Sequence, residues 1–184
     1  MDGACAQTTP DAQPGGHTAA DRTPLRLPGL DEVEHECWRQ FSESATRIGD
    51  LLQRTLTLEH GLSLHDVMLL QTLATAPAGS ARMGDLADAL VLLPSRVTQQ
   101  VARMEGAGLV TRSASPQDRR GVVAAITDAG RVRLAPALHT YARVVRSHFL
   151  DPVNRRQMAS LGDSCRRVGS GFVPPPHRPK PPSL

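Results

Sequence analysis

The segment 94–126 limits the possible folds more than any other part of the chain. It opens with PSRVTQQVARMEGAGL, in which proline is well placed as the first residue of a helix and the glycines end that helix. Its apolar side chains recur at i, i+4 and i+7: Val97, Val101 and Met104. Further along, Val122, Ala124 and Ile126 alternate as in a strand with one covered face. The segment predicts a helix with a narrow buried seam, followed by two short strands around the turn SPQDRRG.

Five other segments are predicted to be helices, because apolar residues recur in them at helical spacing. They begin at Asp31, Ser63, Met83, Thr127 and Asp151-Pro152. The span 91–94 joins the short helix at 83–90 to the next one, which is a helix-turn-helix spacing. The element order is α-α-α-α-β-β-α-α. Only 3% of the residues are aromatic, which favours helix-on-helix packing of aliphatic side chains, so the fold class is mainly α (α+β).

Three of these helices carry specific expectations. The first should bury one broad face, made of Val33, Cys37, Phe41, Ile48 and Leu52 and widened by Trp38, Ala45 and Leu51. Pro136 lies inside the fifth helix and should kink it near Val132. The last helix offers only a meagre apolar surface, made of Met158, Leu161, Cys165 and Val168.

Both ends of the chain lack any apolar period. Residues 1–29 are rich in Ala, Thr, Pro and Gly, and residues 169–184 are rich in proline, so both tails are predicted to be disordered around a folded part at 30–168. We find no apolar run long enough for a membrane span and no signal peptide, which predicts a cytoplasmic protein without a membrane partner. Three widely spaced cysteines without a CxxC pair predict reduced thiols.

Basic charge is concentrated in the segment 94–133. It holds seven arginines against three acidic residues, a net +4 where the whole chain carries +3. The helix from Pro94 presents arginines and short polar side chains almost without acids, and such groups can read the major groove. In the turn, the Asp118 carboxylate can orient one guanidinium, and an arginine at a hairpin tip suits a narrow minor groove. The predicted DNA-binding residues are Ser95, Arg96, Thr98, Gln99, Gln100, Arg103, Arg112, Arg119 and Arg120.

These motifs resemble those of the MarR family of winged-helix regulators. The matching parts are LADAL-x3-PSRVTQQVARMEGAGLVTR, the wing SPQDRRGVVAAIT and the following TDAGRVRLAP. The resemblance implies a homodimer whose helical regions 30–61 and 129–168 interlock, and a winged helix-turn-helix part at 62–128 that binds a pseudo-palindromic double-stranded DNA. It further implies that Arg120 enters the minor groove while Asp118 supports the two-stranded wing. Val91 stands where the family commonly has glycine.

The resemblance also implies a ligand-responsive repressor, with a small-molecule pocket between the dimer helices and the winged part. His35, Trp38 and Arg39 are candidates to line it, although Trp38 fits an ordinary core position better. Cys37 offers a redox-sensing alternative, against which stands its interpretation as a small buried hydrophobe. The histidines show no metal-binding spacing, so neither a metal nor another cofactor is expected.

The chain contains none of the motifs GxSxG, P-loop, GxGxxG or HExxH, so it is not expected to be an enzyme. A winged-helix module that binds proteins rather than DNA is the other alternative. Specific DNA binding weakens steeply with salt because counterions are released, and a protein-binding module would lack that response.

Overall fold

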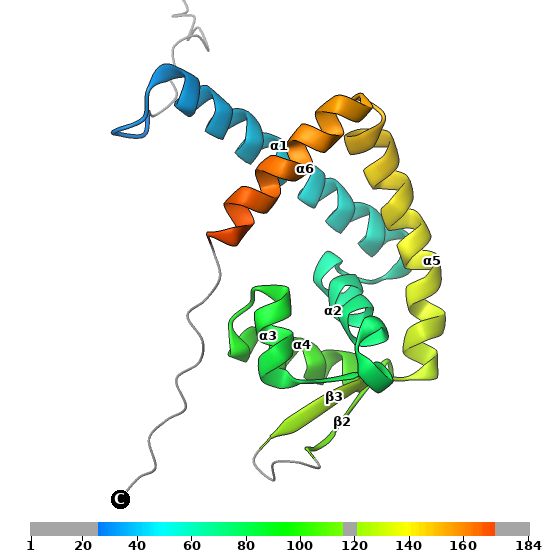
Figure 1. Ribbon diagram of the computed structural model, residues 1–184. Coiled ribbons are helices and arrows are strands. Elements are labelled where there is room, and N and C mark those ends of the chain that lie inside the picture. Colours follow the sequence, from blue (N-terminus) through cyan, green and yellow to red (C-terminus); the bar gives the residue numbers. More distant parts are fainter. Residues whose placement is uncertain (1–25, 116–120, 172–184) are drawn as a thin grey trace, which may run out of the picture. The chain divides into compact units, whose positions relative to one another are not determined.

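The computed structural model describes residues 26–115 and 121–171. The chain divides into two compact units, residues 1–41 and residues 42–184. Helix α1 (Glu32–His60) belongs partly to each (Figure 1, which labels helices α1 to α6 and strands β2 and β3), and further elements follow it. They are α2 (Leu64–Thr75), a 3₁₀ turn (Pro77–Gly79), β1 (Ser80–Arg82), α3 (Met83–Leu90), α4 (Pro94–Gly106), β2 (Val110–Ala114), β3 (Val122–Ile126), α5 (Asp128–Val145), a π-helical turn (Arg146–Leu150) and α6 (Arg155–Ser170).

The predicted fold class is confirmed, with one strand added. The described residues are mostly helical, and β2 and β3 pair antiparallel as the two strands of the predicted wing, with Val110 opposite Ile126. The third strand, β1, pairs antiparallel with β3 and gives the sheet order β1-β3-β2. A strand of three residues is too short to show an alternating pattern, so only its pairing with β3 defines it.

Local capping residues set the helix starts. Ser63 caps α2 in a capping box with Asp66, and the Thr127 side chain accepts a hydrogen bond from the Gly130 N–H at the start of α5, as predicted. The predicted start of the last helix at Asp151-Pro152 is wrong. The Asp151 N–H still donates to the carbonyl of Arg146, so this residue closes the π-helical turn, and Asn154 caps α6 instead.

Two further predictions concern the C-terminal tail and the proline inside α5. α6 runs through Ser170, two residues past the predicted limit of the folded part, and the rest of the tail 169–184 lies almost wholly outside the described residues, as does most of 1–29. α5 is one helix that contains Pro136, whose missing N–H leaves the Val132 carbonyl without its helical donor; the kink near Val132 stays a prediction.

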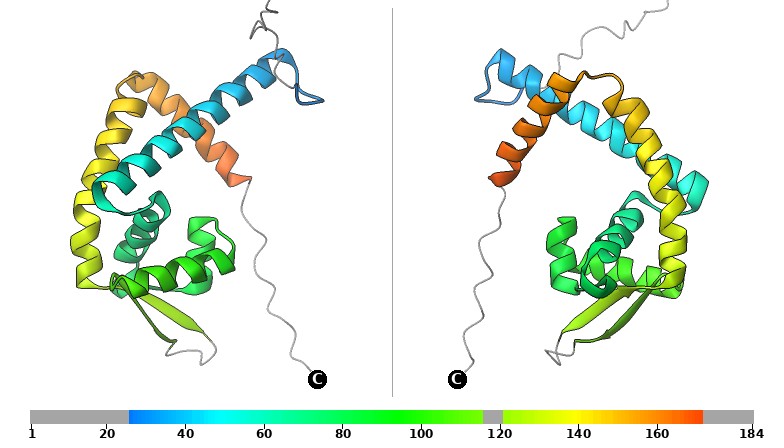
Figure 2. Two further views of the ribbon diagram at one scale, coloured as in Figure 1. Left: turned by 180° about the vertical axis from the view of Figure 1, so that it is seen from behind. Right: turned by 45° about the vertical axis from the view of Figure 1, so that its right-hand side comes forward.

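The core of the unit 42–184 forms around α2. Figure 2 shows α2 flanked by α5 and by the α3–α4 pair, and α2 contacts both α3 and α5. The seam of α4 is buried as predicted, with Val97, Val101 and Met104 all within the core. They pack with Leu56, Leu69, Leu70, Leu73, Leu86, Leu90, Val110 and Ala124. Each such aliphatic side chain contributes about 1.5–3 kcal/mol through burial, so α4 is anchored in this core by its apolar seam.

The predicted buried face of the first helix is wrong for a single chain. Among the stripe residues only Leu52 is buried, joined one turn later by Leu56, while Val33, Phe41 and Trp38 are exposed, Trp38 to 52%. The rings of Trp38 and Phe41 lie 6.0 Å apart and are tilted. No residue of α6 is buried either. Apolar periodicity therefore marks two helical faces that this chain does not cover by itself.

Candidate nucleic-acid interface

Two helices joined by a left-handed turn form the centre of the interface. α3 ends at Leu90, and Val91 follows with φ 53° and ψ 44°, in the left-handed region. The Leu92 N–H then donates to the Ala87 carbonyl over 3.0 Å, which is the long hydrogen bond of a Schellman motif. Glycine is usual at such a position, and a β-branched residue there is strained. The turn angle that places α4 is thus kept, at the cost of local strain.

The outer face of α4 carries most of the predicted polar side chains. Ser95, Arg96 and Gln99 are exposed, as is Thr98, whose Oγ1 donates to the Pro94 carbonyl over 2.9 Å. A groove of about 480 Å³ lies beside this face. It is lined by Ser63, His65, Leu92, Arg96, Gln99, Gln100 and Arg103.

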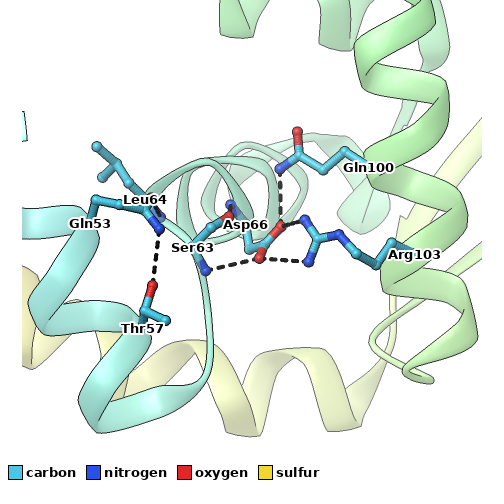
Figure 3. A network of polar contacts seen from close by, with 7 residues as sticks. All are labelled: Gln53, Thr57, Ser63, Leu64, Asp66, Gln100 and Arg103. Atoms are coloured by element: carbon cyan, nitrogen blue, oxygen red, sulfur yellow. Dashed lines mark hydrogen bonds and ion pairs between the residues drawn. The ribbon is translucent and has the colours of Figure 1, made fainter. Parts of the chain in front are cut away.

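Gln100 and Arg103 do not stand free on that face, which corrects the prediction that acids are missing there. Both bind the carboxylate of Asp66, a residue of α2 that is only 1% exposed (Figure 3). The two terminal nitrogens of Arg103, Nη1 and Nη2, donate to the two carboxylate oxygens over 2.9 and 2.5 Å. Gln100 Nε2 donates to Asp66 Oδ1 over 3.3 Å, and the residue Gln100 is only 8% exposed. Gln100 is therefore a buried partner of Asp66 and not a surface side chain.

The charge of Asp66 is held by its neighbours. Burial by itself would raise the pKa of this carboxyl, but the hydrogen bonds from Arg103 and Ser63 outweigh it and lower the pKa below its usual value of 3.8. The pairing also raises the pKa of Arg103. The pair is thus fully ionised at neutral pH.

The hairpin is fastened to α4 by a second ion pair. Arg112 Nε donates to Glu105 Oε2 over 2.7 Å, and the Arg112 N–H donates to Oε1 over 3.1 Å. The hydrogen bond from Arg112 is the main cause that lowers the pKa of Glu105. The predicted wing residues Asp118, Arg119 and Arg120 lie outside the described residues.

A second groove, of about 520 Å³, runs between α4 and the hairpin. Thr98 lines it from α4, Arg112 from β2 and Val122 from β3, together with the segment 82–85 at the start of α3. Thr98 on α4 and the strands of the hairpin therefore border the same groove.

The residues predicted for sensing lie elsewhere. Arg39 binds Glu36 through Nε and Nη2, at 2.8 and 2.7 Å, and this contact, together with a hydrogen bond from Gln40, lowers the pKa of Glu36 to about 2. His35, Trp38 and Arg39 line neither groove. Cys37 is exposed in the single chain, where it is not the small buried hydrophobe of the alternative interpretation. Within 26–115 and 121–171, no three His, Cys, Asp or Glu side chains gather as metal ligands do.

The sequence did not predict a polar contact that joins α1 to α5. Glu59 accepts hydrogen bonds from Thr140 Oγ1 at 2.8 Å and from Arg143 Nη2 at 2.6 Å, and His60 Nε2 also lies 2.9 Å from that hydroxyl. Arg133 donates to the His60 carbonyl over 2.6 Å. More than seventy residues separate the partners in the chain, so no local pattern could have indicated the contact.

An exposed, arginine-bearing second helix, a short turn before it and a paired hairpin beside it define the class: a winged helix-turn-helix DNA-binding protein. The family model of the MarR family matches residues 62–122. A search of curated proteins gave no match. Across the described helices, none combines the length and apolarity needed to cross a membrane.

Solved structures agree with this assignment. The MarR family regulator Sco3205 of Streptomyces coelicolor, solved in complex with DNA, is 34% identical, with 82% of this chain and 97% of that chain covered and a TM-score of 0.77. AbsC, from the same organism, is 28% identical over 78% of this chain and 96% of its own, with a TM-score of 0.73. BpsR of Bordetella bronchiseptica, at 19% identity, shares the fold over 73% of this chain and 98% of its own, with a TM-score of 0.64. The protein belongs to the MarR family of transcriptional regulators.

Proposed function

We propose that this protein is a ligand-responsive repressor that binds a pseudo-palindromic operator as a homodimer in the cytoplasm. The observation that carries the proposal is the groove shared by α4 and the hairpin, with Thr98 on one side and Arg112 on the other. Its DNA-bound relative Sco3205 supports the choice of duplex DNA as the partner. The same comparison gives no support to an enzyme.

The DNA contacts are assigned from exposure and pairing. Ser95, Arg96, Thr98 and Gln99 are exposed on α4 and are proposed to contact base edges and phosphates in the major groove. Arg112, held by Glu105, is proposed to contact the backbone, whereas Arg120, supported by Asp118 and flanked by Arg119, is proposed to enter the minor groove. Gln100 is left out of this set because it is buried.

The homodimer is proposed from the helical faces that the chain leaves uncovered. Regions 30–61 and 129–168 carry exposed large apolar side chains, which a soluble protein covers by association. They are Val33, Trp38, Phe41, Leu58, Val132, Phe149 and Val168. A second copy would bury them and would set two winged parts, each spanning 62–128, on successive turns of one duplex face.

Two kinds of signal are compatible with the family. A small-molecule effector is supported by BpsR, whose DNA binding is regulated by 6-hydroxynicotinic acid, and His35, Trp38 and Arg39 are the proposed lining residues. Redox sensing is the second candidate, because the Cys37 thiol is exposed in the single chain and a thiol that oxidants reach can be oxidised reversibly. A Cys37→Ser variant whose DNA binding still responds to peroxide would eliminate that candidate.

The test is footprinting of the purified protein on the DNA that flanks its own gene, followed by a salt titration of the protected duplex. We expect two symmetric protected half-sites and a binding constant that falls steeply with salt, by a logarithmic slope of about −0.9 for each phosphate neutralised. Arg120→Ala should weaken binding more than Arg112→Ala. No protection together with a flat salt response would favour a protein-binding module.

A further inference from the structure

We propose that Asp66, on α2, is a positioning residue for DNA binding: it fixes Arg103 as a contact to the phosphate backbone and withdraws Gln100 from the bases. The inference rests on the proposed DNA-binding function, and it adds a residue that does not itself touch DNA. Its basis is the hydrogen-bond network drawn in Figure 3.

The Asp66 carboxylate joins two helices through four donors. The Ser63 N–H donates to it at the start of α2, over 2.9 Å, while Gln100 and both terminal nitrogens of Arg103 donate from α4. Gln100 and Arg103 lie three residues apart and therefore on the same side of α4. Because the carboxylate is only 1% exposed, its charge depends on these donors and not on water. The contact therefore holds α4 in one rotation relative to α2.

Arg103 keeps donors for a second partner. A guanidinium has more N–H groups than the two that Asp66 uses, and the Arg103 side chain remains 58% exposed. It lines the 480 Å³ groove together with Arg96 and Gln99. A guanidinium that is already pinned in two places loses little rotamer freedom when a phosphate binds. The orientation of the Arg103 side chain is therefore fixed before DNA binds.

Gln100, unlike Arg103, is withdrawn from the DNA by its contact with Asp66. Its amide donates to Asp66, and its side chain is almost fully buried, so it cannot reach a base edge without breaking that contact. Sequence reading on α4 is thus left to exposed residues on the same helix, such as Ser95, Arg96 and Gln99. Arg103, whose two terminal nitrogens are held by Asp66, is proposed to contact the phosphate backbone, and so it contributes the same DNA affinity for every base sequence.

A purely electrostatic role and a positioning role of Asp66 predict changes of opposite sign in the affinity for DNA when the carboxylate is removed. Removing a carboxylate close to DNA removes a repulsion with the phosphates, so a purely electrostatic role makes Asp66→Asn bind more tightly. A positioning role makes it bind more weakly, because the amide keeps the shape of the carboxylate but not the charge that pins Arg103. The sign of the change therefore decides between the two roles.

The experiment uses the full chain and two labelled duplexes, one with the footprinted sequence and one with the same bases scrambled. We expect Asp66→Asn to weaken binding about tenfold on both duplexes and to reduce the salt slope by about 0.9, the contribution of one phosphate. Arg103→Ala should give the same loss, and the double variant should be no weaker than Arg103→Ala. Asp88→Asn, which removes an exposed charge outside both grooves, is the matched control and should bind like the wild type or slightly better.

Gln100→Met keeps the test falsifiable if Asp66→Asn fails to fold. This variant should leave the affinity ratio between the two duplexes unchanged, because Gln100 reads no base. A drop in that ratio, tighter binding by Asp66→Asn, or additive losses in the double variant would overturn the inference while leaving the proposed function intact. A wild-type protein that binds neither duplex would refute the proposed function and the inference with it.

Discussion

Replacing Val91 by glycine should stabilise the protein even though it removes a side chain. Val91 has φ 53° and ψ 44° in the turn between α3 and α4, and the structure holds it there through the hydrogen bonds that close α3. In this left-handed region the Cβ approaches the following carbonyl oxygen, and branching at Cβ adds to the crowding. Glycine has no Cβ and adopts the same angles without strain.

The size of the effect follows from three contributions. Strain of a non-glycine residue in this region costs about 1–3 kcal/mol. Against this, glycine lowers the free energy of unfolding by about 0.4–1 kcal/mol, because it makes the unfolded chain more flexible. The side chain of Val91 is 89% exposed, so its removal sacrifices almost no buried surface. The net gain is about 1 kcal/mol, which raises Tm by about 2–4 °C for a domain of this size.

The assay is thermal and urea unfolding followed by circular dichroism, with all variants at one protein concentration because the proposed dimer would melt in a concentration-dependent way. Ala89→Gly is the matched control: Ala89 is exposed in the same helix at ordinary helical angles, so this change should destabilise by up to about 1 kcal/mol. If Val91→Gly melted at or below the wild-type temperature, the strain argument would be refuted.

Three further predictions concern stability. Gly130→Ala should destabilise by about 2–3 kcal/mol in urea, because its Cβ would lie 2.3 Å from the Leu109 carbonyl oxygen, whereas Gly84→Ala, which meets open space, should not. Leu70→Ala should cost about 2–5 kcal/mol in the same assay, since Leu70 is fully buried in the core; a loss below 1 kcal/mol would contradict that placement. The lowered pKa of Asp66 means that its contribution is complete above the unfolded value near 3.8 and is lost as the pH falls through the lower folded value. Acid titration of unfolding should therefore show a fall below about pH 4 that is weaker in Asp66→Asn.

Much of the fold was predictable from local features. The starts of α2, α4 and α5 follow from Ser63, Pro94 and Thr127, because capping and proline geometry act within one turn of the chain. The start of α6 was missed although the capping box of Asn154 and Gln157 is present in the sequence, since the aspartate-proline pair before it offered a competing signal.

The candidate site was predictable only in part. Its exposed polar face on α4 and its hairpin could be inferred from composition and alternation, and the family pattern marked position 91 as one where glycine is common, but its left-handed conformation came only from the structure. The partners of Gln100 and Arg103 could not, because Asp66 lies 34 and 37 residues earlier and nothing in a local pattern joins them.

The sequence by itself determined where most of the helices begin and which side chains are apolar, since propensity, capping and periodicity depend on neighbours within a few residues. Only the tertiary structure decided which apolar faces are covered: the seam of α4 is buried in the core, while Trp38 on α1 and Val168 on α6 are left exposed. It also decided that a buried carboxylate takes Gln100 and Arg103 as partners. The physical reason is that burial and charge pairing depend on surfaces that meet only when distant segments pack together.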